Sequence, residues 1–345
     1  MTEDARNLIL PYFGNQGSIP SAAFGSIDFE FEAAGSGVAA TPAAYGPILR
    51  ACAVAETINA ADVTGTAQVG GGTTSIKLAA GASATNDLYN GMPISKTGGT
   101  GSGESGIIVD YDGTTKIATV VSASWTTPDG TTTYSIGACA AYRPASQSLE
   151  MVALYFNIDG VLHKFLGNRG NASIAIGADK IPFWKVTLTG VYVAVIDDTA
   201  PTVVVTGWVR PLVANYVNTP FFSLHGLATA ALDALSLDFG NAVAKVSRIN
   251  TPLRVDVTNR KAVGTVVMEA VTVATKDWFA EAKAATLGPM ALTHGTVAGN
   301  KFSLSAGNTI LKQPKYSDSN GIAMINMSMD VTPMNGNDEF SFVTY

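Results

Sequence analysis

Residues 149–192 read LEMVALYFNIDGVLHKFLGNRGNASIAIGADKIPFWKVTLTGVY, and they indicate the fold of the whole chain. The first apolar run ends at Asp159-Gly160, which favours a two-residue hairpin turn because glycine tolerates a positive φ. We expect the returning strand at 161–166 and a second turn at 167–170. Apolar and polar residues then alternate up to Tyr192, which is the period of strands with one buried face. The segment is therefore predicted to be a four-stranded antiparallel meander with one apolar and one polar face.

The flanking segments must cover the apolar face of this meander. Near the N-terminus, Ile27, Phe29 and Phe31 alternate with three acidic residues, which predicts a strand with one apolar and one acidic face. The polar faces of this strand and of the meander are candidates for an exposed sheet surface. The candidate residues on it are Asp28, Glu30, Glu32, Thr187 and Thr189.

Two features of the first 60 residues flank that strand. Residues 1–20 contain several Gly and Pro residues and are expected to form an extended arm. Thr41-Pro42 is a helix-start signal, with Thr as the cap and Pro at the first helical position. Because Pro47 would break an interior helical turn, the alternative is that this helix begins near Gly46.

The chain has 345 residues, enough for about two domains of ordinary size and a substantial core. Charged residues make up 14% of it, against about a quarter in ordinary soluble proteins, and hydrophobic residues make up 47%. This composition favours a surface that partners cover, although an uncharged polar surface rich in Thr, Ser and Gly would also produce it. The net charge of −6 argues against a protein that grips nucleic-acid phosphates.

The two cysteines, Cys52 and Cys139, are too few for a disulfide framework or a cysteine metal site. We expect two buried free thiols, because assembly in a reducing cytoplasm disfavours a disulfide. Since the two residues flank one segment, a disulfide formed between them after assembly is the alternative. No charged segment is followed by an apolar one as in a secretory signal, so none is expected. No apolar run approaches the about 20 residues of a membrane-spanning helix.

Between residues 61 and 136 the sequence becomes dense in Thr, Gly and Ser. Short alternating runs are separated by turn signals at Asp112-Gly113 and Pro128-Asp129-Gly130, which predicts an inserted all-β domain. The core domain would then be discontinuous, formed by 1–60 and 137–345, and we expect it to fold without the insertion. A disordered low-complexity linker is the alternative interpretation of this composition.

The second half of the chain contains a long excursion and a helix. The segment from Val193 to Pro220 has no clear period, and it is either a contact segment or a solvated loop. A helix is expected at 275–285, with Thr275 as its cap and Asp277 near its positive end. Its predicted buried stripe consists of Trp278, Ala282 and Ala285.

No motif in the chain indicates a reaction, a cofactor or a metal. His163, His225 and His294 do not have the spacing of metal ligands, and we expect hydrogen-bonded histidines in strands or turns. Residues 101–106, GSGESG, match a dinucleotide-binding pattern, but a strand follows them where a helix would be needed. We therefore expect neither an enzyme nor a nucleotide-binding protein.

Several motifs occur in the same order as in a known family. They are Asp159-Gly160 with His163-Lys164 and Arg169-Gly170, Ile181-Pro182, Thr189-Gly190 with Tyr192, the run from Pro47 to Thr57, Leu235–Asn241, Thr275–Phe279, Thr293–Asn300, and the last strands from Tyr316 to Glu339. In this respect the chain resembles the major tail tube proteins of long-tailed, non-contractile bacteriophages. The resemblance covers most of the chain outside the insertion, although Ala53 stands where the family has glycine.

The resemblance implies a structural virion protein, assembled in the host cytoplasm, with a tail-tube-type antiparallel β-sandwich or barrel and one packed helix. Six copies would form a ring, and stacked rings would form a tube that conducts double-stranded DNA without binding it specifically. The insertion would lie on the exterior. Tape-measure, terminator and tip proteins would be partners. The polar sheet face would line the lumen, Trp278 would anchor the helix to the meander, and the candidate inter-ring loop carries Asp197, Asp198, Trp208 and Arg210.

The alternative class is a phage tail adhesin, a carbohydrate-binding protein or a depolymerase-type β-protein. Such a protein would favour clustered exposed aromatic residues and paired carboxylates on one β-scaffold. Aromatic residues make up only 8% of the chain and are dispersed along it, so the tube subunit is the preferred interpretation.

Overall fold

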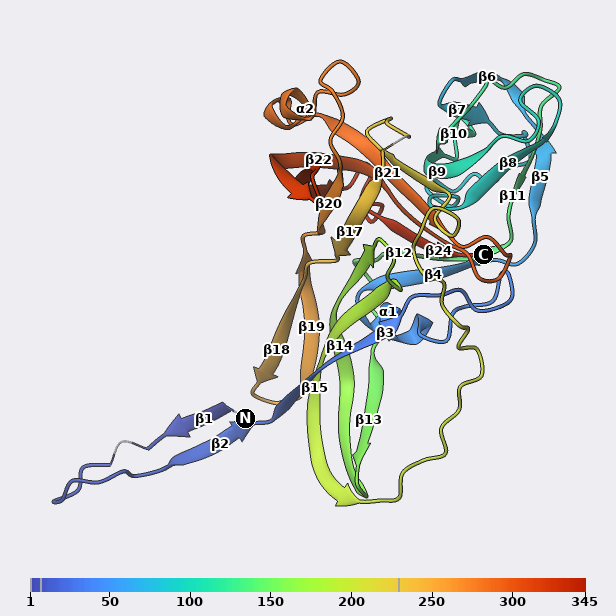
Figure 1. The fold of residues 1–345 in the computed structure, drawn as a ribbon. Helices are drawn as coiled ribbons and strands as arrows, with labels where there is room; N and C mark the ends of the chain where they lie inside the picture. The colour runs from blue at the N-terminus through green and yellow to red at the C-terminus, as the bar shows by residue number, and fades with distance from the viewer. Residues whose placement is uncertain (1, 7, 229) are drawn as a thin grey trace.

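The computed structural model describes residues 2–6, 8–228 and 230–345. Within these residues the protein is built from antiparallel sheets and two helices, α1 (Gly46–Ala51) and α2 (Trp278–Ala284), which confirms the expected mainly β class. Figure 1 shows a central sheet, a second sheet beside its upper end, and hairpins that project from its lower end. No helix in the described part of the chain is long and apolar enough to cross a membrane.

The central sheet contains thirteen strands. Its main path runs β3 (Phe24–Glu32), β15 (Phe183–Asp197), β14 (Val161–Gly177), β17 (Leu232–Asp238), β20 (Val263–Glu269), β23 (Ile322–Thr332), β22 (Phe302–Ser319), β24 (Ser341–Thr344), β12 (Cys139–Pro144) and β4 (Val54–Asn59). Off this path, β13 (Val152–Ile158) pairs with β14, β16 (Phe221–Leu224) pairs with β21 (Leu287–His294), and β21 pairs with β22.

This sheet curls around its own core. Trp184 of β15 is fully buried, and its ring lies 5.0 Å from the ring of Phe342 in β24, although five strands separate β15 from β24 in the sheet. Phe239 packs against Trp184 on one side and stacks on Phe340, with centroids 4.4 Å apart, on the other. The apolar face of the predicted meander is thus covered by the C-terminal strands of the same chain.

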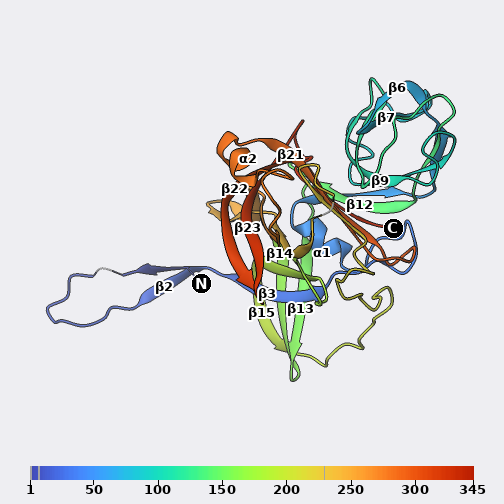
Figure 2. The same ribbon diagram turned by 45° about the horizontal axis from the view of Figure 1, so that its top comes forward.

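The second sheet contains every strand between residues 63 and 136. Its order is β5 (Val63–Thr66), β11 (Thr133–Ile136), β8 (Pro93–Gly98), β9 (Ser105–Asp112), β10 (Ile117–Val121), β7 (Ser75–Lys77) and β6 (Gln68–Gly72). Its apolar cluster includes Ile76, Tyr111 and Tyr134, but also Ala141 of β12 and Val343 of β24. The insertion therefore shares its hydrophobic core with the central sheet, next to which it lies in Figure 2.

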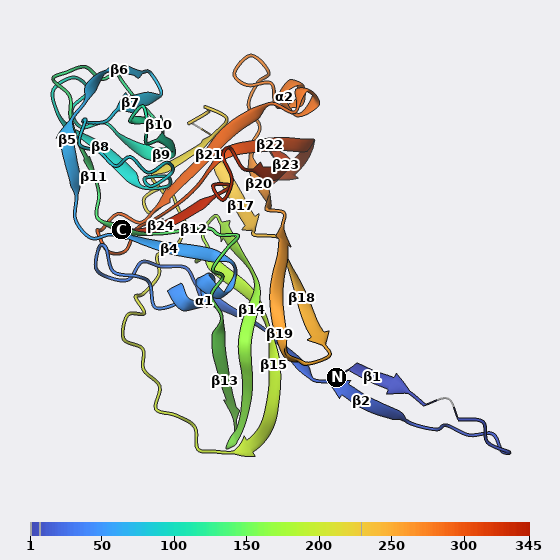
Figure 3. The same ribbon diagram turned by 180° about the vertical axis from the view of Figure 1, so that it is seen from behind.

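Two hairpins form separate two-stranded sheets. One consists of β1 (Thr2–Ala5) and β2 (Ser18–Ala22), and it extends away from the rest of the protein in Figures 1 and 2. The other consists of β18 (Asn241–Arg248) and β19 (Thr251–Arg260), which lie beside β14 and β15 in Figures 1 and 3. Sequence periodicity did not predict this second hairpin.

The predicted turn at 167–170 is wrong, and the meander has three strands where four were expected. The turn at Asp159-Gly160 does form, with φ values of 47° and 83°, and it pairs Ile158 with Val161. Beyond it, β14 continues without interruption to Gly177, and its pairing with β15 shifts register between Leu166 and Arg169. Gly167 absorbs this bulge with a φ of 62°, and the buried Asn168 amide donates to the carbonyl of Val152 at 2.8 Å.

Both helices begin later than their strongest sequence signals. The first helix starts at Gly46 with Pro47 in its first turn, so the alternative start is correct and the Thr41 cap is wrong. The second helix is capped by Asp277, whose carboxylate accepts from the Ala280 amide at 2.9 Å.

The predicted buried stripe of the second helix is also wrong. Trp278 is 2% exposed, but Ala282 is only half-buried, and Ala285 is exposed in the left-handed conformation that ends the helix. Because α2 is a short helix at the edge of the core, only its first residue, Trp278, is buried.

Candidate assembly surfaces

One face of the central sheet carries polar side chains across most of its strands. The carboxylate of Glu30 lies 3.0 Å from the ammonium of Lys185 on β15, and both side chains are more than half exposed. Farther along the same sheet, the hydroxyls of Ser236 and Thr265 are 2.7 Å apart. Beyond them Lys312 of β22 pairs with Asp330 of β23. Exposed ion pairs of this kind contribute little to stability, so this face is a solvated surface that the fold itself does not require.

Four of the five residues expected on the polar face are exposed, and the fifth is buried. Asp28, Glu30 and Glu32 are exposed on β3, and the hydroxyl of Thr187 on β15 donates to the carboxylate of Asp28. Thr189 is only 7% exposed, so its placement on an open polar surface is wrong. It pairs across the sheet with Arg169, and its hydroxyl lies 3.3 Å from that of Ser26.

Arg169 has a role that the sequence did not indicate beyond its place in a motif. Its guanidinium donates to the carbonyls of Leu149 and Val255, at 2.8 and 2.9 Å, and to the carboxylate of Asp256 at 2.8 Å. One side chain therefore fastens the β18–β19 hairpin to β14 and to the segment before β13. The planar guanidinium of arginine has several N–H donors in a fixed arrangement, so it can bond to two carbonyls and a carboxylate at once. A lysine ammonium could not make all of these hydrogen bonds in the same geometry.

Several strand edges remain unpaired in the described part of the chain. The first strand of the central sheet, β3, pairs only with β15, and the last, β4, pairs only with β12. In the hairpin, β18 pairs only with β19. Unpaired edges offer rows of amide and carbonyl groups that pair readily with another chain, so natural proteins usually cover them.

Large apolar side chains are exposed at two opposite ends of the protein. At the lower end in Figure 1 lies the projecting blade, which we define as β13 with residues 161–166 of β14 and 191–197 of β15. Tyr155 is 62% exposed and Ile158 is 53% exposed there. At the upper end, Phe279 of α2 packs 5.5 Å from Tyr316 of β22, and Tyr316 is 63% exposed. These two apolar patches differ in shape and composition.

The loop at 198–220 is anchored at both ends and at one point between them. Asp197 ends β15, and the amide of Asp198 donates to the carbonyl of Gly160 at 2.8 Å. Trp208 is 45% exposed and packs edge-on against Phe31, with centroids 6.1 Å apart. Arg210 is exposed, and its carbonyl accepts from the Asn300 side chain.

Between these anchors the loop leaves apolar residues in solvent. The exposed fractions of Val203, Val204 and Val205 are 83%, 73% and 68%. No strand forms at 203–206. Trp208 therefore holds the loop against its own chain, and the free contact surface in this loop is the valine run that precedes it.

Trp278 lies in the main hydrophobic cluster, and its helix packs on β22 rather than on the meander. Its indole N–H has no hydrogen-bond partner within the described residues. The ammonium of Lys276 lies 5.6 Å from its ring and 2.8 Å from the carbonyl of His225. The tryptophan is thus a packing residue of the core.

A hydrogen-bonded chain next to Trp278 has the order of a catalytic triad. His225 Nδ1 lies 2.9 Å from the carboxylate of Glu281, and Nε2 lies 3.0 Å from the hydroxyl of Thr309. Burial lowers the pKa of His225, against the opposing effect of Glu281. Thr309 is completely buried, however, and its hydroxyl also bonds to the carbonyl of Gly288. No substrate can reach it, so the chain fastens α2 to the sheet.

The other two histidines also contact side chains of their own chain. His294 Nδ1 lies 2.9 Å from the Thr219 hydroxyl, and burial lowers the pKa of this histidine. His163 packs against the ring of Phe156. Among the described residues no group of three or more His, Cys, Asp or Glu residues could hold a metal ion. Cys52 and Cys139 are buried free thiols, and burial raises the pKa of Cys139 to about 12.

The GSGESG segment forms the tight connection from β8 to β9 around a buried lysine. Lys96 is fully buried, and its ammonium lies 2.8 Å from the carboxylate of Glu104 and 4.1 Å from the centre of the Trp125 ring. A side chain at Gly101 would collide with that ammonium, and Gly101 also has a φ of 77°. Gly101 therefore makes room for an internal ion pair.

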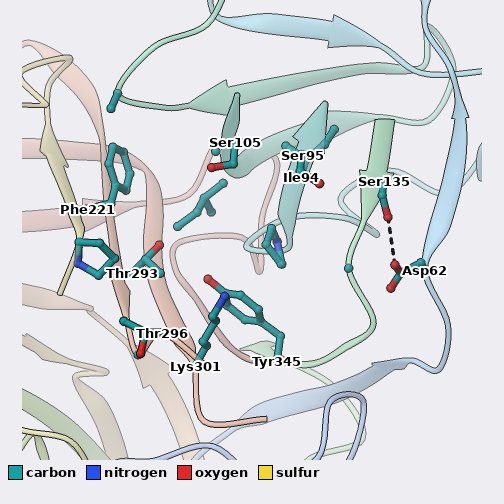
Figure 4. Close-up of a pocket in the computed structure, with 17 residues that line it drawn as sticks. Asp62, Ile94, Ser95, Ser105, Ser135, Phe221, Thr293, Thr296, Lys301 and Tyr345 are labelled. Carbon is teal, nitrogen blue, oxygen red and sulfur yellow. Dashed lines mark hydrogen bonds between the residues drawn. The ribbon is translucent and has the colours of Figure 1, made fainter. Parts of the chain in front are cut away.

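Cavities lie in the seam between the insertion and the central sheet. Figure 4 shows one of about 620 Å³, with Ser95, Ser105 and Ser135 on the insertion side and Phe221 and Lys301 on the other. Asp62 accepts from the Ser135 hydroxyl at 3.2 Å. Its lining contains hydroxyls and apolar groups together with the charged side chains of Asp62 and Lys301. Near this seam, Arg143 is half-buried and donates to the carbonyls of Asn90 and Leu88, and desolvation of its guanidinium lowers its pKa to about 10.

No family model matches the chain, and no curated protein sequence matches it. The structure defines a mainly β protein with one uncovered polar sheet face, unpaired strand edges and apolar patches at opposite ends.

Proposed function

We propose that the protein is a structural subunit that polymerises as stacked hexameric rings into the tail tube of a long-tailed, non-contractile bacteriophage. The choice of family rests on the order of the sequence motifs. The physical support for assembly comes from where the protein leaves apolar side chains and strand edges uncovered. The observation that carries the proposal is that the two exposed apolar patches, on the projecting blade and around Phe279 and Tyr316, are different surfaces at opposite ends.

Two unlike patches favour heterologous, head-to-tail contacts between copies. Contacts of that kind produce rings or open-ended filaments, whereas a twofold dimer requires one self-complementary patch. The unpaired edge of β3 favours lateral growth of the sheet in the same way, because a closed barrel removes edge strands.

In such a tube the polar sheet face would line the channel. Asp28, Glu30 and Glu32 outnumber the bases beside them on β3 and β15, so this wall would be acidic. An acidic wall repels phosphates, and DNA would therefore pass without being held. The tape-measure protein during assembly, and the terminator and tip proteins at the tube ends, are the partners that this role requires.

Electron microscopy of the purified protein tests the proposal. We expect tubes of uniform diameter, or rings with sixfold symmetry, at protein concentrations in the micromolar range or above. A protein that remains monomeric by light scattering at every concentration and salt tested would contradict it. Trimers that resist heating would instead favour the alternative class, an adhesin or depolymerase-type β-protein.

A further inference from the structure

Two unpaired strands of this chain match in length and carry opposite charge. The edge strand β3 has nine residues, with Asp28, Glu30 and Glu32 as its charged residues and no base. The hairpin strand β18 has eight residues, with Lys245 and Arg248 as its charged residues and no acid. Each strand pairs with one neighbour only, so each presents a free row of backbone donors and acceptors.

The charges on these two strands are largely unneutralised within one copy. Lys245 and Arg248 are exposed, and neither forms an ion pair with the described residues. Arg248 makes one long hydrogen bond, of 3.5 Å, to the carbonyl of the preceding residue. On β3, only Glu30 has an ion-pair partner within the part of the chain that the structure describes, and that pair is more than half exposed to water.

The apolar faces of the two strands are also incompletely covered. Ile27, Phe29 and Phe31 of β3 are half-buried, although they pack on the main cluster. Val243 and Val246 of β18 are half-buried as well, and Ile249 at the hairpin tip is 92% exposed. A two-stranded hairpin has little stability of its own in water, and a third strand would extend both its hydrogen bonding and its apolar face.

We propose that the free edge of β18 in one copy lies along the free edge of β3 in the next copy. Within the assembly proposed above, on which this inference rests, the contact joins neighbouring subunits through added strand pairing. Backbone hydrogen bonds supply the affinity, and the cationic strand against the acidic strand selects the partner and excludes pairing of two like strands. The occupant of each edge is a second copy of this chain.

Charge exchange tests the contact. One variant carries Glu30→Lys and Glu32→Lys, a second carries Lys245→Glu and Arg248→Glu, and a third carries all four changes. Each of the first two variants should raise the protein concentration needed for assembly at least about tenfold, because every contact then opposes like charges. The third should restore assembly, since both sides of every contact are exchanged.

The matched control is Lys77→Glu, which reverses a half-exposed charge on β7 of the insertion, away from both strands and from both apolar patches. It should assemble at the wild-type concentration, and all four variants should keep the wild-type circular dichroism and unfolding midpoint. A second measurement mixes separate Glu30→Cys and Lys245→Cys variants, for which oxidation should produce a disulfide-linked dimer that neither variant forms alone.

The outcomes separate this inference from the proposed function. If the wild type forms tubes but either charge-reversed variant assembles equally well, the edge contact is overturned and the tube subunit stands. The same conclusion follows if the variant with all four changes fails to recover. If the wild type forms no rings or tubes, the proposed function fails, and the edge contact fails with it.

Discussion

The insertion buries nearly all of its large apolar side chains, whereas the projecting blade leaves many of its own exposed. Between residues 61 and 136, all of which the structure describes, Val69 is the one exposed large apolar side chain. The much shorter blade exposes six, which are Tyr155, Phe156, Ile158, Leu166, Val195 and Ile196. Both regions are antiparallel β-structure, so secondary structure does not explain the contrast.

The difference lies in what each sheet has to pack against. The insertion folds its strands over a shared cluster and adds Ala141 and Val343 from the central sheet to it. The blade has nothing on its outer half, and the same residue types remain in water there. Exposed apolar patches of this kind often mark contact sites, which supports the contacts between copies that we propose.

Removing the insertion should have the largest effect on stability of the changes considered, because it uncovers part of the central sheet. If 61–136 is replaced by a short Gly/Ser linker, Ala141 and Val343 lose their apolar partners. Burial of each such side chain contributes on the order of 1–3 kcal/mol, so several kcal/mol of unfolding free energy should be lost. Urea unfolding of the deletion variant measures this. An unchanged midpoint and normal tubes would show that the core folds without the insertion, as the sequence had led us to expect.

Trp278→Ala should cost about 3–5 kcal/mol of unfolding free energy, because it leaves a large cavity in the main cluster. Trp278→Phe is the matched control, and it should be mild because the buried indole N–H has no partner to lose. Soluble yield and thermal unfolding measure both. A Trp278→Ala monomer with wild-type stability that fails to assemble would instead place this residue in a contact between copies.

Within the insertion, Glu104→Gln should cost about 3 kcal/mol, because the ammonium of Lys96 would remain buried without its counter-charge. The matched control is Glu150→Gln, whose partner Arg50 keeps a second carboxylate at Glu56. Since the Glu150 side chain is 57% exposed, that change should cost less than about 1 kcal/mol. Equal midpoints for the two variants would show that the buried pair adds no stability.

The same ion pair predicts a response to acid. Burial acts to raise the pKa of Glu104, but hydrogen bonds from Lys96 and Thr126 outweigh it and lower the pKa from 4.5 to about 2. The stabilisation is therefore complete above the ordinary pKa and is lost as the pH falls from about 4.5 towards 2. Tryptophan fluorescence, to which Trp125 beside this ion pair contributes, follows the unfolding. Glu104→Gln should lose this part of the pH dependence, and a wild-type slope in the variant would assign it to other carboxylates.

In the blade, Tyr155→Ser with Phe156→Ser should change monomer stability by no more than about 0.5 kcal/mol, since both side chains are exposed. Assembly, followed by sedimentation and microscopy, should be lost. Val69→Ser in the insertion removes an even more exposed side chain and should leave both stability and assembly unchanged. Normal tubes from the double variant would show that the blade faces solvent in the assembly.

Local sequence chemistry determined the parts of this protein in which a few neighbouring residues settle the geometry. Asp159-Gly160 makes its hairpin because those two residues accept positive φ, and alternation placed Asp28, Glu30 and Glu32 on the exposed face of β3. The mainly β class followed from the same period-two pattern. The cationic residues of β18 were visible in the sequence, but no periodic signal marked that hairpin as a strand pair.

Only the tertiary structure decided the features that depend on distant partners. Gly167 and Asn168 form a bulge and not a turn because Val152, on the neighbouring strand, supplies the acceptor for the buried amide. Thr189 has the alternation of an exposed residue, but it is only 7% exposed where it lies opposite Arg169 of β14. Periodicity tells which way a side chain points from its own strand, whereas burial depends on what another part of the chain places over it.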